Sequence, residues 1–184
     1  MQKSYREFIG TPIRDRLSKA LLGKVSDLVV SPINGEVLAL FTRKDKRWLL
    51  PTVDVSKVVA DIVWVENAEA LAAPDDIVRI ADVIKLNISI FGNKVFTVGR
   101  QYLGEVVDFR FETNGWVLTK IDVAKRILTI PTQQKLINSS QIVRIKASEV
   151  TVRDAVVQTK VRATQQEANA PDFASAVFKT KQCR

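Results

Sequence analysis

The chain has 184 residues, 46% of them hydrophobic, with 28 Lys and Arg against 20 Asp and Glu, for a formal net charge of +8. The hydrophobic fraction is that of a folded domain, and no apolar run approaches the roughly 18 residues of a membrane span. The absence of His and the presence of one Cys exclude Ser-His-Asp, Cys-His and ordinary zinc sites.

Together, these residue counts predict a protein that is not an enzyme and that uses no cofactor and no metal. The single Cys, Cys183, cannot form an internal disulfide, which fits a reducing cytosol and predicts a cytoplasmic location.

The first part of the chain has the pattern of a small β domain. Leu28 and Val30 alternate with other residues in the period of two that is typical of a half-buried strand. Asn34-Gly35 is a strong hairpin signal, because both residues tolerate positive φ. Further strands are predicted at residues 37–42, 48–50 and 62–65, and Pro51 ends one of them, since Pro cannot donate a hydrogen bond to a sheet.

A short amphipathic helix is predicted next, over residues 74–86. Ile77, Ile80, Ala81 and Ile84 recur at helical spacing, so the helix should pack an apolar stripe on the β domain. The adjacent acids Asp75-Asp76 follow Pro74 and are interpreted as helix capping residues, with an acid/base or metal role as the weaker alternative.

The chain after the predicted helix repeats the strand and hairpin pattern of the first β domain. Residues 106–112 alternate, with Val107, Phe109 and Phe111 on one face, and Asn114-Gly115 is a second hairpin signal. Further strands are predicted at residues 116–122, 127–130 and 142–145. From about residue 157 the composition turns polar, which predicts a flexible, basic tail.

The repeat has an offset of about 80 residues. It aligns Asn34-Gly35 with Asn114-Gly115, and Glu36 with Trp116. Three further segments align along the chain: Leu22-Gly23-Lys24-Val25 with Leu103-Gly104-Glu105-Val106, Leu50-Pro51-Thr52 with Ile130-Pro131-Thr132, and residues 62–65 with residues 142–145.

Each copy resembles the PRC-barrel family. The family pattern is a Gly-x-x-Val step, then Leu-Gly-x-Val-x-Asp entering a long strand, a Gly-containing turn and an Ile-Pro step. The matching residues in this sequence are Gly10-Thr11-Pro12-Ile13, Leu22-Gly23-Lys24-Val25-Ser26-Asp27 and Leu50-Pro51, then Gly92-Asn93-Lys94-Val95, Leu103-Gly104-Glu105-Val106-Val107-Asp108 and Ile130-Pro131.

The resemblance implies a mainly β fold of two small antiparallel PRC-type barrels. We expect the first barrel at residues 1–73, the linking helix at 74–86, the second barrel at 87–156 and the tail at 157–184. The resemblance also implies a non-enzymatic function, since the family includes the cytoplasmic part of a photosynthetic reaction-centre subunit and a domain of a ribosome-maturation factor. If the copies arose by duplication, a pseudo-two-fold axis should relate them.

Two tryptophans are candidate partner-binding residues because the repeat aligns each with a charged residue. Trp64 aligns with Arg144 and Trp116 with Glu36, which suggests outward positions for both. We expect them to help the barrels dock or to meet a partner, and cover by the helix or the tail is the alternative. Trp48 aligns with Leu128 and is predicted to be in the core.

The remaining candidate partner-binding residues lie in two basic loops and in the tail. The alternative for the loops is that they are ordinary solvated turns, and the alternative for the tail is that it has no function. The candidates are Arg43, Lys44, Lys46 and Arg47 in one turn, Lys125 and Arg126 in the matching turn, and Phe173 and Phe178 in the tail.

The expected function is therefore that of a non-catalytic adaptor that binds another macromolecule, with a protein as the expected partner. The alternative is an RNA- or ribosome-associated factor that uses the basic loops. Attachment to a membrane surface is a weaker possibility, because the hydrophobic face of the tail is small.

Overall fold

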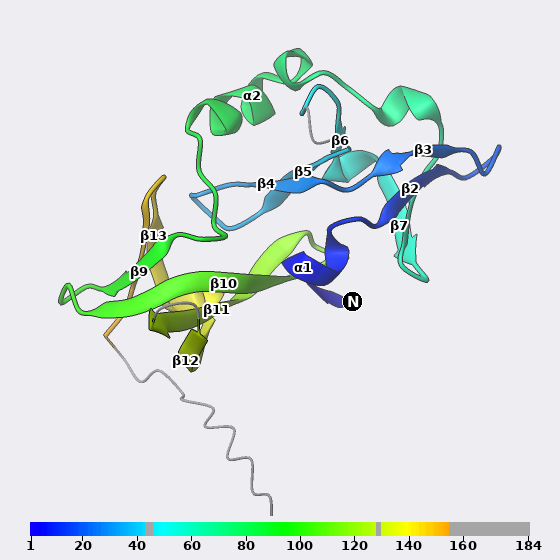
Figure 1. Ribbon diagram of the computed structural model, residues 1–184. Helices are drawn as coiled ribbons and strands as arrows, with labels where there is room; N and C mark the ends of the chain where they lie inside the picture. The colour runs from blue at the N-terminus through cyan, green and yellow to red at the C-terminus, as the bar shows by residue number, and fades with distance from the viewer. Residues whose placement is uncertain (43–45, 128–129, 155–184) are drawn as a thin grey trace, which may run out of the picture.

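The computed structural model describes residues 1–42, 46–127 and 130–154, with the backbone alone at 126–127 and 130–133. It is mainly β, as predicted (Figure 1). Two α-helices occur among the described residues, α1 (Tyr5–Phe8) and α2 (Val78–Lys85), and neither is long and apolar enough to span a membrane.

Residues 12–65 form what we call the first unit, which has two sheets. The orders of the strands are β3-β2-β8-β7 and β4-β5-β6. The strands are β2 (Pro12–Asp15), β3 (Leu21–Lys24), β4 (Asp27–Val30), β5 (Val37–Phe41), β6 (Leu49–Pro51), β7 (Val55–Val59) and β8 (Ile62–Val65).

Residues 94–152 form the second unit, a single sheet in the order β12-β11-β10-β9-β14-β13. The N-terminal strand β1 (Gln2–Ser4) adds to this sheet by pairing with β10. Within the described residues none of the three sheets closes on itself, so the two barrels expected from the family resemblance are seen as open sheets. The strands are β9 (Lys94–Thr97), β10 (Tyr102–Glu112), β11 (Val117–Ile127), β12 (Ile130–Asn138), β13 (Ile142–Ile145) and β14 (Glu149–Val152).

The two units follow the same plan, strand for strand. The long strand β10 corresponds to β3 and β4 together, and the parallel pair β2·β8 corresponds to β9·β14. Register shifts occur at matching places, between Val29 and Val30 and between Arg110 and Phe111. The loop contacts match as well, since the amides of Gly10 and Gly92 donate to the carbonyl oxygens of Val25 and Val106, which are counterparts.

The offset between the units is not constant, which corrects the sequence alignment. It is 81 residues from Val37 to Leu118, which occupy the same place in the two registers. It becomes 87 from Leu50 to Ile137, because the hairpin between β11 and β12 is longer than that between β5 and β6. The counterpart of Pro51 is therefore Asn138, not Pro131.

The corrected register changes the counterparts of Trp64 and Trp116. Trp64 corresponds to Thr151 instead of Arg144. Trp64 pairs with Arg14 of the parallel strand β2, and Thr151 pairs with Phe96 at the matching position of the parallel strand β9. Trp116 corresponds to Gly35, and both have positive φ. The prediction that Trp48 lies in the core is wrong, since 45% of its surface is exposed.

The two hairpins dock against each other across an approximate two-fold axis. Glu36 and Val117, which are counterparts, form an antiparallel bridge with each other. The amide of Val37 donates to the carbonyl oxygen of Trp116 at 2.6 Å, and the amide of Leu118 donates to the carbonyl oxygen of Gly35 at 2.8 Å. Exchanging the two units turns each of these hydrogen bonds into the other.

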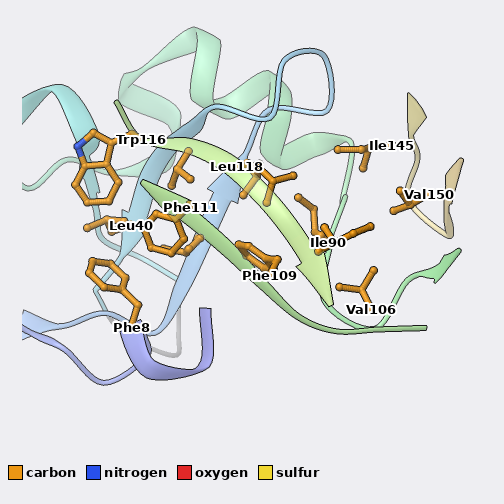
Figure 2. Close-up of a cluster of buried hydrophobic side chains, with 14 of the residues drawn as sticks. Phe8, Leu40, Ile90, Val106, Phe109, Phe111, Trp116, Leu118, Ile145 and Val150 are labelled. Atoms are coloured by element: carbon orange, nitrogen blue, oxygen red, sulfur yellow. The ribbon is translucent and has the colours of Figure 1, made fainter. Parts of the chain in front are cut away.

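A single hydrophobic core continues through this junction (Figure 2). Phe8 from α1 contacts Phe111 and Trp116 edge-on, with ring centroids 5.1 and 6.1 Å apart. Leu40 of the first unit and Leu118 of the second belong to the same cluster. Burying such rings stabilises a fold by several kcal/mol in order of magnitude, so this core holds the units together.

Helix α2 covers the outer face of the β4-β5-β6 sheet, as the helical spacing predicts. Ile80 is buried there with Val29 and Phe41. The carboxylate of Asp76 accepts the Ala73 amide at 2.9 Å and so caps the turn that precedes the helix. The matching face of the second unit is charged, with an Arg110–Asp122 ion pair at 3.4 Å in place of apolar contacts.

Gly104 allows β10 and β11 to approach each other closely, which gives a testable prediction. Its φ is +136°, and a Cβ there would lie 2.4 Å from the carbonyl oxygen of Ala124. We expect Gly104→Ala to lower the free energy of unfolding by about 3 kcal/mol or more, since neither backbone can move cheaply. Urea unfolding measures this change.

The matched control is Gly115→Ala, because a Cβ there would meet only Val117, at 3.8 Å. Its expected effect is below about 1 kcal/mol. Equal effects of the two substitutions would contradict the close approach of β10 and β11.

Candidate interaction surface

Trp64 lies on the outer face of the β3-β2-β8-β7 sheet because strand alternation turns its neighbours inward. Val63 and Val65 are fully buried, whereas Trp64 between them is only partly buried. In the register, Arg14 of β2 and Lys57 of β7 lie directly beside Trp64 on either side. Directly paired residues share a face, so the two cations flank the indole.

The turn between β2 and β3 brings a third cation over the same ring. Lys19 has a φ of 61° in this turn. Its Nζ lies 5.0 Å from the centroid of the Trp64 ring, within the range of a cation–π interaction. Arg14 Nη1 donates to the Lys19 carbonyl oxygen at 2.8 Å and so holds the turn in place. We call Arg14, Lys19, Lys57 and Trp64 the Trp64 face.

The carboxylates near the Trp64 face make their hydrogen bonds and ion pairs with other residues. The Asp15 carboxylate accepts the amides of Ser18 and Leu17, and these hydrogen bonds, with a smaller contribution from the charge of Lys19, lower its pKa. Glu66 pairs with Arg16 at 2.8 Å, and this contact lowers the Glu66 pKa. In the described part of the chain no carboxylate forms an ion pair with a cation of the Trp64 face.

The second unit has a related surface at the matching place, with a different charge balance. Arg100, the counterpart of Lys19, lies 5.2 Å over the ring of Phe96. Phe96 in turn contacts Tyr102, with centroids 5.4 Å apart. Arg100 is paired with Glu149 at 3.3 Å, so this surface is more nearly neutral than the Trp64 face.

Trp116, the other candidate tryptophan, is 9% exposed and lies between the two units. Its ring stacks on Phe111 and meets Phe8 edge-on. Of the two roles expected for it, this position fits docking of the units.

The predicted basic turn is described only in part. Lys46 pairs with Asp27 at 2.8 Å, and its Nζ lies 5.1 Å over the ring of Phe41. Arg47 is exposed, as its neighbour Lys46 is. Arg43 and Lys44 lie outside the described residues.

Lys125 and Arg126 are at the end of β11, in the hairpin that matches this basic turn. Lys125 is half-buried, and only the backbone is described for Arg126. Phe173 and Phe178 lie outside the described residues. Among the described basic candidates, Lys46 contacts Asp27 and Phe41 rather than Trp64.

Sequence reasoning missed the three cations of the Trp64 face. Arg14 and Lys57 are 43 residues apart and meet Trp64 only through the parallel pairing of β2 with β8 and the hairpin of β7 with β8. The alternation of residues 62–65 was the available signal, since it marks one side of β8 as outward.

A second polar cluster joins the two units at the start of β4. The Tyr5 hydroxyl donates to Asp27 at 3.1 Å, and Asp27 also pairs with Lys46. Tyr5 stacks on Phe109 of the second unit with centroids 4.7 Å apart. Burial, and then the negative charge of Asp27, raise the pKa of the Tyr5 phenol well above its ordinary value.

This raised pKa predicts a loss of stability at alkaline pH. Above about pH 10 the unfolded chain releases the Tyr5 proton and the folded chain keeps it, so the free energy of unfolding falls by up to about 1.4 kcal/mol per pH unit. The fall continues until the folded pKa is reached. Urea unfolding at about pH 9 and about pH 11 should show a smaller loss in Tyr5→Phe than in the unaltered chain.

The control is Tyr102→Phe, which leaves Tyr5 as the one tyrosine of a chain that has two. Its near-ultraviolet absorbance should show no tyrosinate until the protein unfolds. A tyrosinate signal at an ordinary pKa in the folded protein would contradict the Tyr5–Asp27 contact.

Comparison with known proteins gives a family for the first part of the chain. The sequence model of the family described as PRC-barrel domain matches residues 1–72. The match does not extend to the second unit, residues 94–152. A search of curated proteins finds no match to the chain. Residues 1–72 are therefore a PRC-barrel domain.

Proposed function

We propose that the protein is a non-catalytic adaptor that binds another macromolecule through the Trp64 face. The observation that carries this proposal is the arrangement of Arg14, Lys19 and Lys57 around a partly exposed tryptophan, with no carboxylate of the described residues paired to them. Trp and Arg are enriched among the residues that dominate binding energy at protein interfaces. Unpaired cations beside them favour an acidic partner and speed its association.

An acidic segment of a protein fits this face better than RNA does. Non-specific binding of single strands depends on bases that stack on exposed aromatic rings. At Trp64 the Lys19 ammonium already lies over the ring, in the place that a base would take. Lys46, one of the described basic residues of the hairpin turn, is likewise paired with Asp27.

We further infer that the second unit is a diverged PRC-type domain and that the chain arose by tandem duplication. Matching register shifts, the paired Gly10 and Gly92 contacts and the exchange-symmetric junction at Glu36 and Val117 support this. The duplication would leave one copy of the cation–aromatic surface on each unit. Because Arg100 of the second unit is paired with Glu149, the Trp64 face of the first unit is the more positive of the two surfaces, and it is the one that we propose as the binding face.

A pull-down from native extract tests the proposed function. The full chain is the bait, beside Trp64→Ala and Lys57→Glu, with Lys85→Glu as the control because Lys85 is also an exposed lysine but lies on α2. We expect one partner that is retained by the unaltered chain and the control and that is reduced about tenfold by each substitution of the Trp64 face.

The same experiment with added nuclease separates protein from RNA. Retention after nuclease treatment supports a protein partner, and loss after it shows binding through RNA. If both substitutions of the Trp64 face retain every partner of the unaltered chain, this face is not the binding surface.

A further inference from the structure

The two units differ at one edge of their sheets. In the second unit, residues 110–112 of β10 are covered by β1, which pairs Lys3 with Phe111. The corresponding part of the first unit is the outer edge of β4, the terminal strand of its sheet in the described chain. An uncovered strand edge presents backbone donors and acceptors to any extended segment.

A groove runs along this uncovered edge. It has a volume of about 170 Å³ and lies between β4 and the segment that follows α2. Its surface is half polar and half apolar, and Asp27 and Lys46, which form an ion pair, belong to the polar part. The lining residues that matter here are Leu28, Val30, Ile84, Ile88, Tyr5 and Phe109.

The backbone of Val30 faces this groove. The amide of Ser31 donates to the Glu36 carbonyl oxygen at 2.8 Å, toward β5, so strand alternation turns the amide and carbonyl of Val30 outward. The Leu28 amide is already bound to the Asp27 carboxylate at 2.8 Å. Pro32 follows directly after Ser31 and has no amide to offer, so the available edge is short.

We propose that the β4 edge binds an extended segment of a partner protein, which adds as a strand and places an aliphatic side chain in the groove. The occupant is a strand because the corresponding edge of the second unit holds one, β1. It comes from another protein because β1 of this chain is already paired with β10. The side chain is aliphatic because Leu28, Val30, Ile84 and Ile88 surround it.

This site is separate from the Trp64 face, and its failure would leave the proposed function untouched. Strand addition derives its affinity from backbone hydrogen bonds and its specificity from the pockets that receive alternate side chains. A small groove beside a short edge therefore predicts selection of a few residues of sequence, with one dominant aliphatic position.

A random 12-residue peptide library displayed on phage, selected against the full chain, tests the proposal. We expect enriched peptides that share an aliphatic position, and we expect the bound peptide to slow hydrogen exchange of the Val30 amide. Ser89→Trp places a large ring at the groove lining and should weaken binding by about tenfold or more.

Ser140→Trp is the matched control, since Ser140 is an exposed serine that does not line the groove. It should leave peptide affinity within about twofold of the unaltered chain. The proposal is overturned if no peptide is enriched, if enriched peptides bind Ser89→Trp equally well, or if they protect other amides and not that of Val30. A small apolar molecule that binds without protecting Val30 would also overturn strand addition.

Discussion

The rest of the structure depends on the junction where the two hairpins meet. Glu36 and Val117 bridge there, flanked by the hydrogen bonds of Val37 with Trp116 and of Leu118 with Gly35. Each unit is an open sheet arrangement that leaves apolar side chains uncovered on one side. Docking through this junction buries the rings of Phe8, Phe111 and Trp116 in one core. Small open sheets need this kind of cover, because few residues of each unit can be buried in isolation.

A shared backbone plan lets two nearly equivalent units take different surfaces. In the first unit the outer sheet face is apolar and α2 covers it, whereas the second unit has the Arg110–Asp122 pair there. In the second unit β1 covers the strand edge that β4 leaves open. The linking helix and the N-terminal strand therefore each cover one unit only, and this asymmetry leaves the groove beside β4.

Sequence patterns predicted the repeat, the β character and the helix, because period-two alternation, Asn-Gly pairs and helical spacing are local signals. The constant offset was wrong, since the longer hairpin between β11 and β12 adds residues that no local pattern marks. Val107 was expected to face the core, but a register shift between Val106 and Asp108 leaves Val106 buried instead. Long-range pairing also determined the site, because Arg14 and Lys57 meet Trp64 only through β2 and β7.

Native-state hydrogen exchange in increasing urea, measured separately for Leu40 in the first unit and Ile121 in the second, tests most directly whether the units form one cooperative structure. The account predicts that both amides exchange with the same free energy of opening, and that Trp116→Ala lowers this free energy equally at both, because the indole belongs to their common core. Loss of protection at Ile121 with no change at Leu40 would show that the units fold independently and would contradict the account.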